Sequence, residues 1–267
     1  MKLTVLTDNN TYIDQYYLGE PAVAYYIEAE GQTFLFDTGY SDVYLKNARA
    51  MGIDLAKVET VILSHAHNDH TGGLVAFPRQ DGRVRVVAHP EVFSPRREGS
   101  LNIGSPYSLE EMQQRFQLNL SAAPIQLTSR LTYLGAIPRV NTFENQAPVG
   151  ERWTSTGWVP DYVPDDSALV YTREEGIYII TGCSHAGICN IMDYARRATG
   201  KEKILGMLGG CHLFAGNSQQ TRATAAFMAE AGIEKLYPCH CTSLAAKVTI
   251  NQSIAVREVG VGLELEW

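Results

Sequence analysis

The sequence lacks the features that would place it in a membrane or mark it for export. No stretch approaches the roughly 20 consecutive apolar residues that a membrane-spanning helix needs. The first residues, MKLTVLTDNN, hold one lysine and a short apolar stretch, without the long apolar core and cleavage site of a signal peptide. We therefore expect a cytoplasmic protein with no membrane partner.

Paired cysteines and an excess of basic residues are also missing. The chain has 5 cysteines, an odd number, and no two have CxxC spacing, so we expect reduced thiols. The formal net charge of −7 argues against nucleic acid as a partner held by overall charge, and a small-molecule substrate is expected instead. The oligomeric state does not follow from the sequence. A G-x-S-x-G motif is absent, which argues against a serine nucleophile of that kind.

The sequence does contain alternating strand and helix patterns along its 267 residues. Two β-rich runs around Glu30–Gly31 predict a hairpin, and a second hairpin is predicted around Glu174–Gly176. Ser41 is the expected N-cap of the first helix, and Gly52 and Gly200 follow two predicted helix ends. Helices are predicted over residues 41–52, 186–200, 220–232 and 242–251. Mixed sheets flanked by helices, in one α/β (α+β) domain over 1–267, fit this order.

From about residue 91 to 166 the pattern weakens, although 108–120 is predicted as a helix and 130–140 as a strand. The apolar periodicity is too weak for a separate core, so we expect an inserted, lid-like region over a site. Arg96 and Arg97 lie in it, and guanidinium forks suit phosphate; a solvated surface pair is the alternative. Four aromatic residues of this region fit either a pocket for a flat ring or, preferably, packing within the insert: Tyr107, Trp153, Trp158 and Tyr162.

The stretch ILSHAHNDHTGG, residues 62–73, gathers His65, His67, Asp69 and His70 directly after an apolar run. At the end of a strand, residues two apart share a face, so His65 and His67 can reach one ion. Asp69 and His70 come just past the strand and can serve a second ion. Imidazole and carboxylate suit Zn, and also Mn or Fe, whereas Ca or Mg would require more oxygen ligands. The alternative is a solvated polar loop without a metal.

Three of the remaining histidines also follow predicted strands: His185 in GCSHAG, His212 in GGCHL and His240 in PCHCT. Loops that follow strands gather around a site at the edge of a sheet, which makes these residues candidate ligands. A histidine satisfied at a strand end is the alternative for each. His89, in VVAHP, is less clearly placed.

The pattern H-x-H-x-D-H followed by T-G-G resembles the signature of the metallo-β-lactamase superfamily. LFDTG, with Asp37, resembles the first motif of that superfamily. TGCSHAGICN and PCHCTS are similar to one subgroup, the 7,8-dihydropterin-6-methyl-4-(β-D-ribofuranosyl)aminobenzene 5′-phosphate synthase-like proteins. The resemblance extends over most of the chain. It implies a four-layer αββα sandwich with a dinuclear metal centre.

Carried over position by position, the resemblance also implies roles for individual residues. Asp37 would orient a ligand imidazole or the loop beside it, or else cap the turn before Gly39. Asp69 would be both a ligand and the residue that takes or relays a proton. The implied metal ligands form two sets, His65, His67 and His185 for one metal, and Asp69, His70 and His240 for the other.

One departure from the superfamily concerns the bridging carboxylate. The family pattern has an aspartate in a Gly-Asp context after a strand, and none is found here. Cys183, in TGCSH, takes that place, and Cys211 and His212 follow in GGCH. Cys183 and His212 are therefore further candidate ligands. We expect one metal to bind firmly and the second more weakly.

The expected activity is metal-assisted hydrolysis by an activated water, with one or two Zn ions, or Mn or Fe. A phosphorylated small molecule, as a phosphoester or phosphodiester, is the expected substrate. Three alternatives remain open. The first is a carbon-carbon bond-forming synthase with the metals as Lewis acids, the second a redox diiron protein, which His67 disfavours, and the third a metal-binding sensor.

Overall fold

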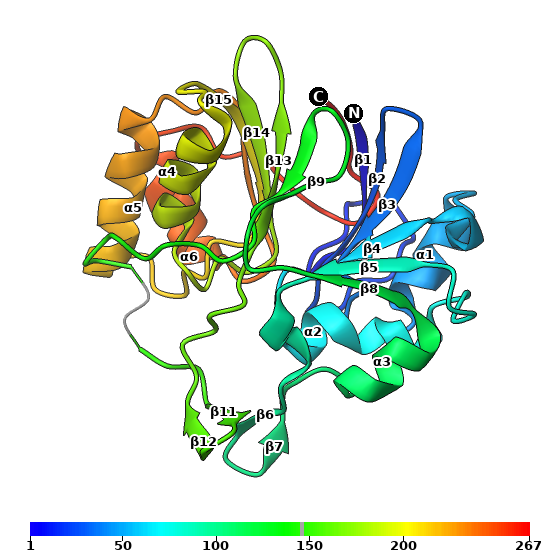
Figure 1. The fold of residues 1–267 in the computed structure, drawn as a ribbon. Helices are drawn as coiled ribbons and strands as arrows, with labels where there is room; N and C mark the ends of the chain where they lie inside the picture. Colours follow the sequence, from blue (N-terminus) through cyan, green and yellow to red (C-terminus); the bar gives the residue numbers. More distant parts are fainter. Residues whose placement is uncertain (145–146) are drawn as a thin grey trace. The chain divides into compact units, whose positions relative to one another are not determined.

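The computed structural model describes residues 1–144 and 147–267. The chain forms two compact units. The first, here called unit 1, comprises Met1–Ala122, Pro148–Asp165 and Gly260–Trp267, and unit 2 comprises Ala123–Ala147 and Asp166–Val259. Both units are built from β-sheets and helices, as the predicted α/β (α+β) class requires (Figure 1). The single domain with an insert at about 91–166 stays a prediction.

Unit 1 contains a seven-stranded sheet in the order β17-β1-β2-β3-β4-β5-β8. Its antiparallel part includes the predicted hairpin, which turns at Glu30–Gly31, and its parallel part runs from β3 to β8. The terminal strands pair, and the Met1 ammonium donates to the Trp267 carbonyl at 2.7 Å. The strand bounds are Glu264–Glu266, Lys2–Thr7, Ala24–Ala29, Gln32–Phe36, Thr60–Ile62, Arg85–Ala88 and Gln117–Leu120, in sheet order.

Three helices accompany this sheet: α1 (Val43–Ala50), α2 (Asn68–Thr71) and α3 (Leu109–Arg115). Short 3₁₀ turns occupy Leu55–Lys57, Gly72–Ala76 and Pro90–Phe93. Tyr44 of α1 packs in one apolar cluster with Leu35 and Val61. The N-cap prediction for α1 is wrong, because Asp42 is the N-cap and the Ser41 hydroxyl donates to Glu20 Oε2 at 2.6 Å.

The weakly patterned region contributes to more than one sheet. A four-stranded sheet, β12-β11-β6-β7, forms within unit 1 from Gly157–Pro160, Glu151–Thr154, Arg96–Glu98 and Leu101–Asn102. Trp153 and Trp158 face each other across β11 and β12, with ring centroids 5.4 Å apart. Tyr107 lies under the Arg115 guanidinium at 4.7 Å and donates to Gln80 Oε1. These contacts match the packing interpretation of the aromatic residues.

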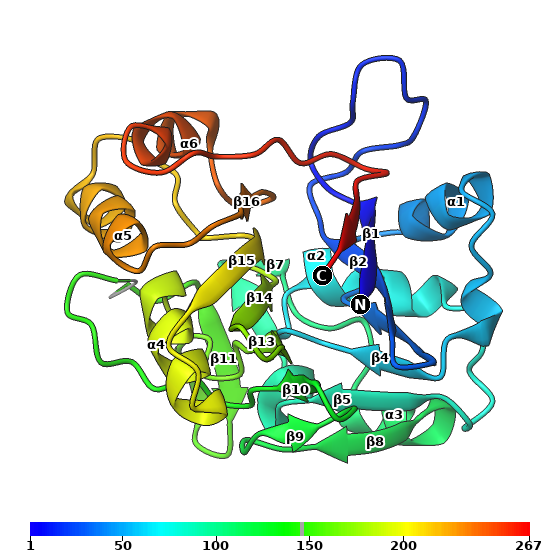
Figure 2. The same cartoon turned by 90° about the horizontal axis from the view of Figure 1, so that it is seen from above.

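Unit 2 contains a six-stranded sheet in the order β16-β15-β14-β13-β10-β9. Strands β14, β15 and β16 are parallel, and β13 and β14 form the predicted hairpin. The bounds are Leu236–Pro238, Ile204–Gly209, Ile177–Thr181, Ala168–Thr172, Leu131–Tyr133 and Ile125–Gln126. Helices α4 (Ile188–Thr199), α5 (Gln219–Glu230) and α6 (Leu244–Asn251) match their predictions, and α5 lies beside α6 (Figure 2).

The start of α4 has an unusual cap. Its N-cap is Gly187, which has no side chain to accept the first helical N–H groups, and the Glu144 carboxylate takes this role. Glu144 Oε1 accepts from Cys189 N at 2.8 Å and Oε2 from Asn190 N at 2.9 Å. A Cβ at Gly187 would lie 2.4 Å from Glu144 Oε2, so only glycine fits here. The segment before α4 is therefore held by a residue from a distant loop.

Candidate metal centre

The carboxyl ends of two parallel strands position the histidine cluster of unit 1. Asp37 directly follows β3, and its N–H donates to the Ile62 carbonyl of β4 at 2.8 Å. Ser64 N in turn donates to Asp37 Oδ1 at 2.7 Å, which fixes the segment between β4 and α2. Parallel strands end at the same edge of a sheet, so the residues that follow them meet there.

A hydrogen-bond network around Asp37 fixes the orientation of two imidazoles. Asp37 Oδ2 lies 2.7 Å from His70 Nδ1 and accepts from the Ser64 hydroxyl at 2.7 Å. Ser64 has a single hydroxyl proton, so His65 Nδ1, 2.9 Å from Ser64 Oγ, must donate its own. Both Nδ1 atoms then carry protons, which leaves Nε2 of His65 and His70 with lone pairs for a ligand role.

His65 and His67 present nitrogens to each other. His65 Nε2 and His67 Nδ1 are 3.0 Å apart, a separation that a common ion bound at about 2.0–2.1 Å from each nitrogen would produce. Burial lowers the pKa of His67 to about 4, so the ring is neutral at neutral pH, as metal binding requires. His70 Nε2 lies 3.6 Å from Asp69 Oδ2, and the Asp69 side chain is 30% exposed.

A hollow of about 340 Å³ in unit 1 adjoins these residues. Asp69 and His67 line one part of it, and the exposed ring of Tyr40 lines another. The remaining lining residues are Pro21, Asn68, Glu98, Ile103 and Val149. The hollow therefore combines two candidate metal ligands with an aromatic ring and apolar surface, and its lining contains no lysine or arginine.

Arg96 lies in an internal ion pair. Its side chain is fully buried, NH1 binds Asp161 Oδ2, and NH2 lies 2.5 Å from Asp165 Oδ1. Asp165 Oδ2 also accepts from Ala66 N at 2.8 Å, between His65 and His67. These contacts favour a structural role for Arg96, in which an internal ion pair holds the histidine loop, while its assignment as a substrate ligand stays a prediction.

Arg97 remains accessible. Its side chain is 38% exposed, pairs with Glu151 at 2.9 Å, and stacks over the Trp158 ring at 4.2 Å. These contacts leave part of the guanidinium facing solvent, which is compatible with either a surface role or a contact to phosphate.

His89 has a local structural role. It is the N-cap of the 3₁₀ turn Pro90–Phe93, and its Nδ1 accepts from Glu91 N at 3.2 Å.

In unit 2, candidate ligands follow three parallel strands. Cys183 and His185 follow β14, His212 follows β15, and His240 follows β16. Ser184, His212 and His240 have φ values of 64°, 51° and 49°, in the left-handed region that non-glycine residues seldom adopt. Such a conformation costs about 1–3 kcal/mol per residue and is maintained where the surroundings impose it, often at functional sites.

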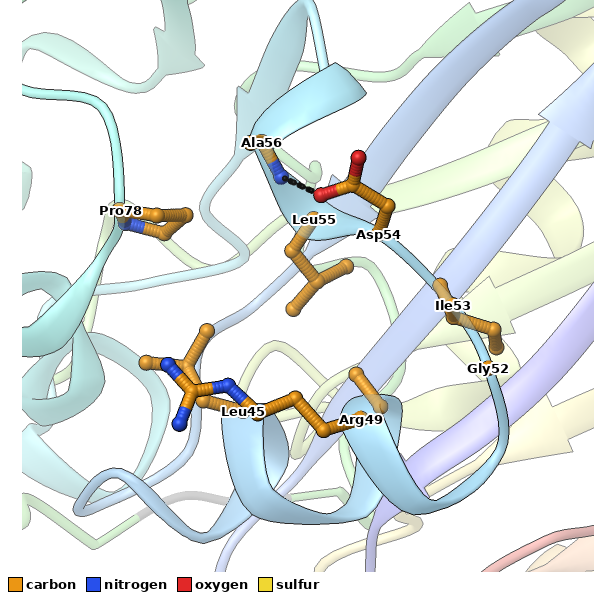
Figure 3. Close-up of a pocket in the computed structure, with 9 residues that line it drawn as sticks. Leu45, Arg49, Gly52, Ile53, Asp54, Leu55, Ala56 and Pro78 are labelled. Atoms are coloured by element: carbon orange, nitrogen blue, oxygen red, sulfur yellow. Dashed lines mark hydrogen bonds between the residues drawn. The ribbon is translucent and has the colours of Figure 1, made fainter.

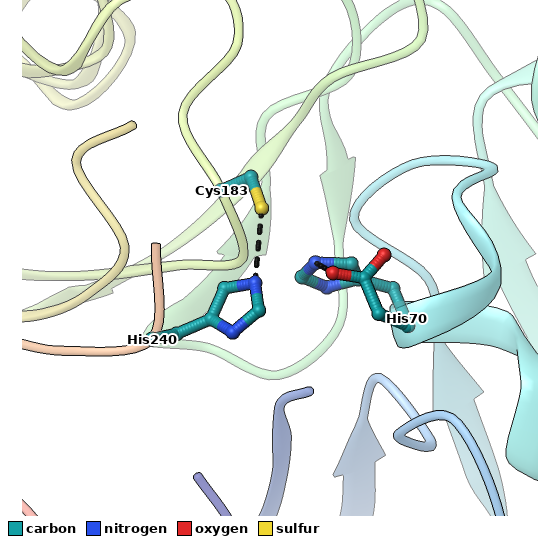
Figure 4. A group of neighbouring side chains, drawn as sticks. His70, Cys183 and His240 are labelled. Carbon is teal, nitrogen blue, oxygen red and sulfur yellow. Dashed lines mark hydrogen bonds and ion pairs between the residues drawn. The ribbon is translucent and has the colours of Figure 1, made fainter. Parts of the chain in front are cut away.

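Two groups of donor atoms form within unit 2. His240 Nε2 faces Cys183 Sγ at 3.2 Å (Figure 4). Cys183, His185 and His212 each offer one donor atom, and these three atoms lie within 4.8 Å of one another. The rings of His185 and His212 are 4.2 Å apart. The structure thus brings together the four unit 2 residues that the sequence indicates.

Sequence reasoning missed the neighbouring thiol of Cys241. His212 N donates to Cys241 Sγ at 3.2 Å, and Cys241 Sγ lies 3.4 Å from the Cys183 carbonyl. Burial alone would raise the pKa of Cys241, but hydrogen bonds with Cys183 and His212 and nearby imidazoles hold it well below its usual value. Ser64 and Asp165 were missed as well. A serine before a histidine carries no signal of its own, since its role depends on the parallel pairing of β3 and β4.

A second hollow in unit 1 is unrelated to this chemistry. It has a volume of about 390 Å³ and lies between α1 and the turn at Leu55, with Arg49 and Asp54 at its margin (Figure 3). The Asp54 carboxylate caps the turn by accepting from Ala56 N at 3.1 Å. None of the candidate ligands lines it.

A family model described as the metallo-beta-lactamase superfamily matches residues 18–240. The chain belongs to this superfamily, and the predicted fold class is confirmed. A solved structure, Tm1679, described as a metal-dependent hydrolase of the beta-lactamase superfamily, is similar to the chain, with 28% identity and a TM-score of 0.86. It covers 100% of this chain and 99% of its own.

A curated relative is the 7,8-dihydropterin-6-methyl-4-(beta-D-ribofuranosyl)-aminobenzene-5'-phosphate synthase of Methanocaldococcus jannaschii. It is 28% identical over 265 residues, which cover 92% of this chain and 89% of the relative. The predicted resemblance to that subgroup is confirmed. A diphosphatase of the PhnP family, at 13% identity and a TM-score of 0.55, shares the fold across 100% of this chain and 97% of its own.

The donor atoms of the candidate ligands fit a divalent transition metal. They are imidazole nitrogens, one carboxylate and one thiol, the ligand types that proteins use for zinc and related ions. In the part of the chain that the structure describes, no helix combines the length and the apolar character that spanning a bilayer requires.

Proposed function

We propose that the protein is a metal-dependent hydrolase that acts on a phosphorylated small molecule. The observation that carries this proposal is the arrangement of the unit 1 histidines. His65 Nε2 and His67 Nδ1 face each other at 3.0 Å, and His70 is oriented by a buried carboxylate at 2.7 Å. Imidazoles fixed by outer hydrogen bonds are the usual construction of a protein metal site.

The proposed ligands are those that the resemblance to the superfamily assigns along the sequence. Both predicted ligand sets lie within the residues that the family model matches. They are His65, His67 and His185 for one metal, and Asp69, His70 and His240 for the other. Their order along the chain and the family membership support this assignment. A divalent ion held there supplies an acidified water and stabilises negative charge on a phosphoryl or carbonyl oxygen. We take Zn as the first choice, with Mn or Fe as alternatives.

Asp69 is the proposed proton carrier. Its carboxylate is partly exposed and lines the hollow beside His67, and the residue lies in the first turn of the four-residue helix α2. Asp37, by contrast, is fully buried and serves to hold the tautomer of His70. The two carboxylates thus have different tasks, one in contact with the substrate space and one behind the ligands.

The hollow beside Asp69 is the proposed binding place for the organic part of the substrate. Tyr40, Ile103 and Val149 offer a ring face and apolar surface. Its lining has no lysine or arginine, so the proposed phosphate contacts are the metal centre and the partly exposed Arg97. Both a phosphoester and a phosphodiester fit this arrangement, in which the organic part occupies the hollow and the phosphate contacts the metal centre and Arg97.

The test combines metal analysis with turnover. Purified protein is analysed for Zn, Mn and Fe, and then assayed on a panel of a phosphomonoester, a phosphodiester and a lactone, with His65→Ala as the metal-site variant. We expect turnover of a phosphoester that falls by at least 100-fold in His65→Ala. Equal rates for wild type and variant on every substrate would show that the proposed hydrolysis is wrong.

A carbon-carbon bond-forming synthase is the second candidate, and the 28% identity to the archaeal synthase over 92% of the chain favours it. The same residues would hold the metal, which would then act as a Lewis acid. Product analysis with a ribosyl-phosphate donor and an aromatic acceptor separates the two functions, because only the synthase gives a product that contains both carbon skeletons. Iron with a visible absorption band would instead indicate a redox protein.

A further inference from the structure

We propose that unit 2 holds a metal of its own through a thiolate site made of Cys183, His185 and His212. The donor atoms of these three residues lie within 4.8 Å of one another, all inside one compact unit. This inference goes beyond the ligand sets above, which assign no role to His212. It shares His185 with the first set but does not depend on turnover.

The environment of His212 is the main support. Its Nδ1 is buried and has no hydrogen-bond partner among residues 1–144 and 147–267. A buried polar atom without a partner costs about 1–3 kcal/mol, so such atoms are seldom retained without use. A bound metal would provide the missing partner.

The backbone and ring of His212 are held in place by their neighbours. The residue has a φ of 51°, and its N–H donates to Cys241 Sγ at 3.2 Å. The Phe214 ring packs edge-on against the imidazole with centroids 4.8 Å apart. A strained residue whose backbone and ring are both held by neighbours is already oriented for a ligand role and is not free to rotate.

The Cys183 loop is equally constrained. The Ser184 hydroxyl donates to the Gly210 carbonyl at 2.6 Å, which ties the loop after β14 to the loop after β15. A Cβ at Gly210 would lie 2.5 Å from the carbonyl oxygen of Gly182, so glycine is required for the loops after β14 and β15 to approach. The close backbone contact between these loops therefore brings Cys183 and His185 near His212, and no flexible side chain is needed to do so.

The donor set determines which metals fit. One thiolate and two imidazoles favour Zn, Co or Cu(I) and disfavour Mn and Mg, which prefer oxygen ligands. Zn–S and Zn–N bonds of about 2.3 and 2.0–2.1 Å place tetrahedral ligands about 3–4 Å apart, so a small closing movement of the side chains completes the site. The ion has three protein ligands and keeps a position for a further donor.

The experiment measures Co(II) binding by absorption, since a cobalt–thiolate bond gives a charge-transfer band in the near ultraviolet. The full-length double variant His65→Ala/His67→Ala removes two unit 1 ligands and leaves the three unit 2 residues intact. We expect one Co(II) that gives the thiolate band, in addition to the ion held by the intact set of Asp69, His70 and His240. Adding Cys183→Ser should abolish the band, and adding His212→Gln should weaken Co(II) binding by at least tenfold.

Two matched variants serve as controls, and both should leave Co(II) binding unchanged. Cys211→Ala removes a thiol whose pKa is raised to about 12 by burial and which lies outside the group. His89→Gln removes a histidine of the 3₁₀ turn. A thiolate band that survives Cys183→Ser, or Co(II) affinity that is unaffected by His212→Gln, would overturn the proposal.

A measurement on the zinc-loaded double variant covers the case in which further substitutions disturb folding. X-ray absorption should detect a sulfur at about 2.3 Å from zinc. Absence of any sulfur neighbour, or failure of the double variant to bind a metal, refutes the site. Turnover enters none of these readouts, so the thiolate site can fail while the proposed hydrolase function stands, and the reverse also holds.

Discussion

At the scale of single residues, Asp37 links the end of one strand to the orientation of a proposed ligand on the next. Its two carboxylate oxygens accept from Ser64 N and Ser64 Oγ and bind His70 Nδ1, all at 2.7 Å. A carboxylate is needed because each of these contacts requires an acceptor. A substitution of Asp37 that keeps the shape of the side chain but introduces a hydrogen-bond donor should therefore disturb these three contacts.

Asp37→Asn is that change. The amide would place N–H groups opposite either Ser64 or His70 Nδ1–H, which favours the wrong tautomer of His70. We expect metal affinity to fall by about 10–100-fold, as for other residues behind metal ligands. Competition with a chromophoric chelator measures it, and Asp42→Asn at the exposed start of α1 is the control. Unchanged affinity in Asp37→Asn would mean that Asp37 only caps its turn.

Arg96 and Arg97 are adjacent in sequence and opposite in environment, which makes them a matched pair. Replacing buried Arg96 with methionine removes the cation of Asp165 and leaves Asp161 only Arg152 at 3.9 Å, so the free energy of unfolding should fall by about 3–5 kcal/mol. Arg97→Met removes a half-exposed pair and should cost less than about 1 kcal/mol. Denaturant unfolding of both variants decides this. Similar losses for the two variants would contradict the structural role assigned to Arg96.

At the scale of elements, α4 depends on a carboxylate contributed from outside the helix. Burial raises the pKa of Glu144, while the N–H groups of Cys189 and Asn190 oppose the rise. The folded-state pKa lies above the unfolded value, so this group's contribution to stability is complete below the unfolded pKa of about 4.5 and is lost as pH rises through the folded pKa.

The expected result is a pH-dependent difference between wild type and Glu144→Gln. The glutamine variant cannot ionise, so its stability relative to wild type should improve as pH rises from about 4 to 7. Unfolding midpoints at several pH values measure this, with Glu151→Gln as an exposed control. A difference that is constant over this pH range would exclude the titration of Glu144 as its source.

The elements also show how far local sequence signals reach. The two hairpins and the helices α4, α5 and α6 follow from turn residues and periodicity that are visible in the sequence. The predicted helix over 108–120 is only half right, since α3 ends at Arg115 and Gln117–Leu120 forms β8. That segment pairs with β5, a contact between residues about 30 positions apart. Its sequence, QLNL, alternates polar and apolar residues, but so short a segment does not decide between helix and strand, and pairing with β5 determines the outcome.

At the scale of the whole molecule, one rule explains most of the candidate site. In unit 1, β3 is parallel to β4, and in unit 2, β14, β15 and β16 are parallel to one another. Each of these strands is followed by candidate ligands or by Asp37. The ligand types could therefore be predicted from residues that follow apolar runs. The burial of Arg96 and the contact between His212 and Cys241 could not, because they depend on pairs more than 25 positions apart.

Metal removal tests the molecule as a whole. An ion that binds only the folded chain adds RT ln(1 + [metal]/Kd) to its stability, about 2.7 kcal/mol at 100 times Kd. For a chain of this size that corresponds to a rise in Tm of roughly 5–10 °C. Chelation should therefore lower Tm by this amount, and added Zn should restore it. Because the sequence offers Cys183 where the superfamily pattern has its bridging aspartate, we expect two steps, with one equivalent lost to a mild chelator and the other retained. Two equivalents that leave together would show that the two metals are bound equally firmly. An unchanged Tm after complete removal would show that the stability of the fold does not depend on them.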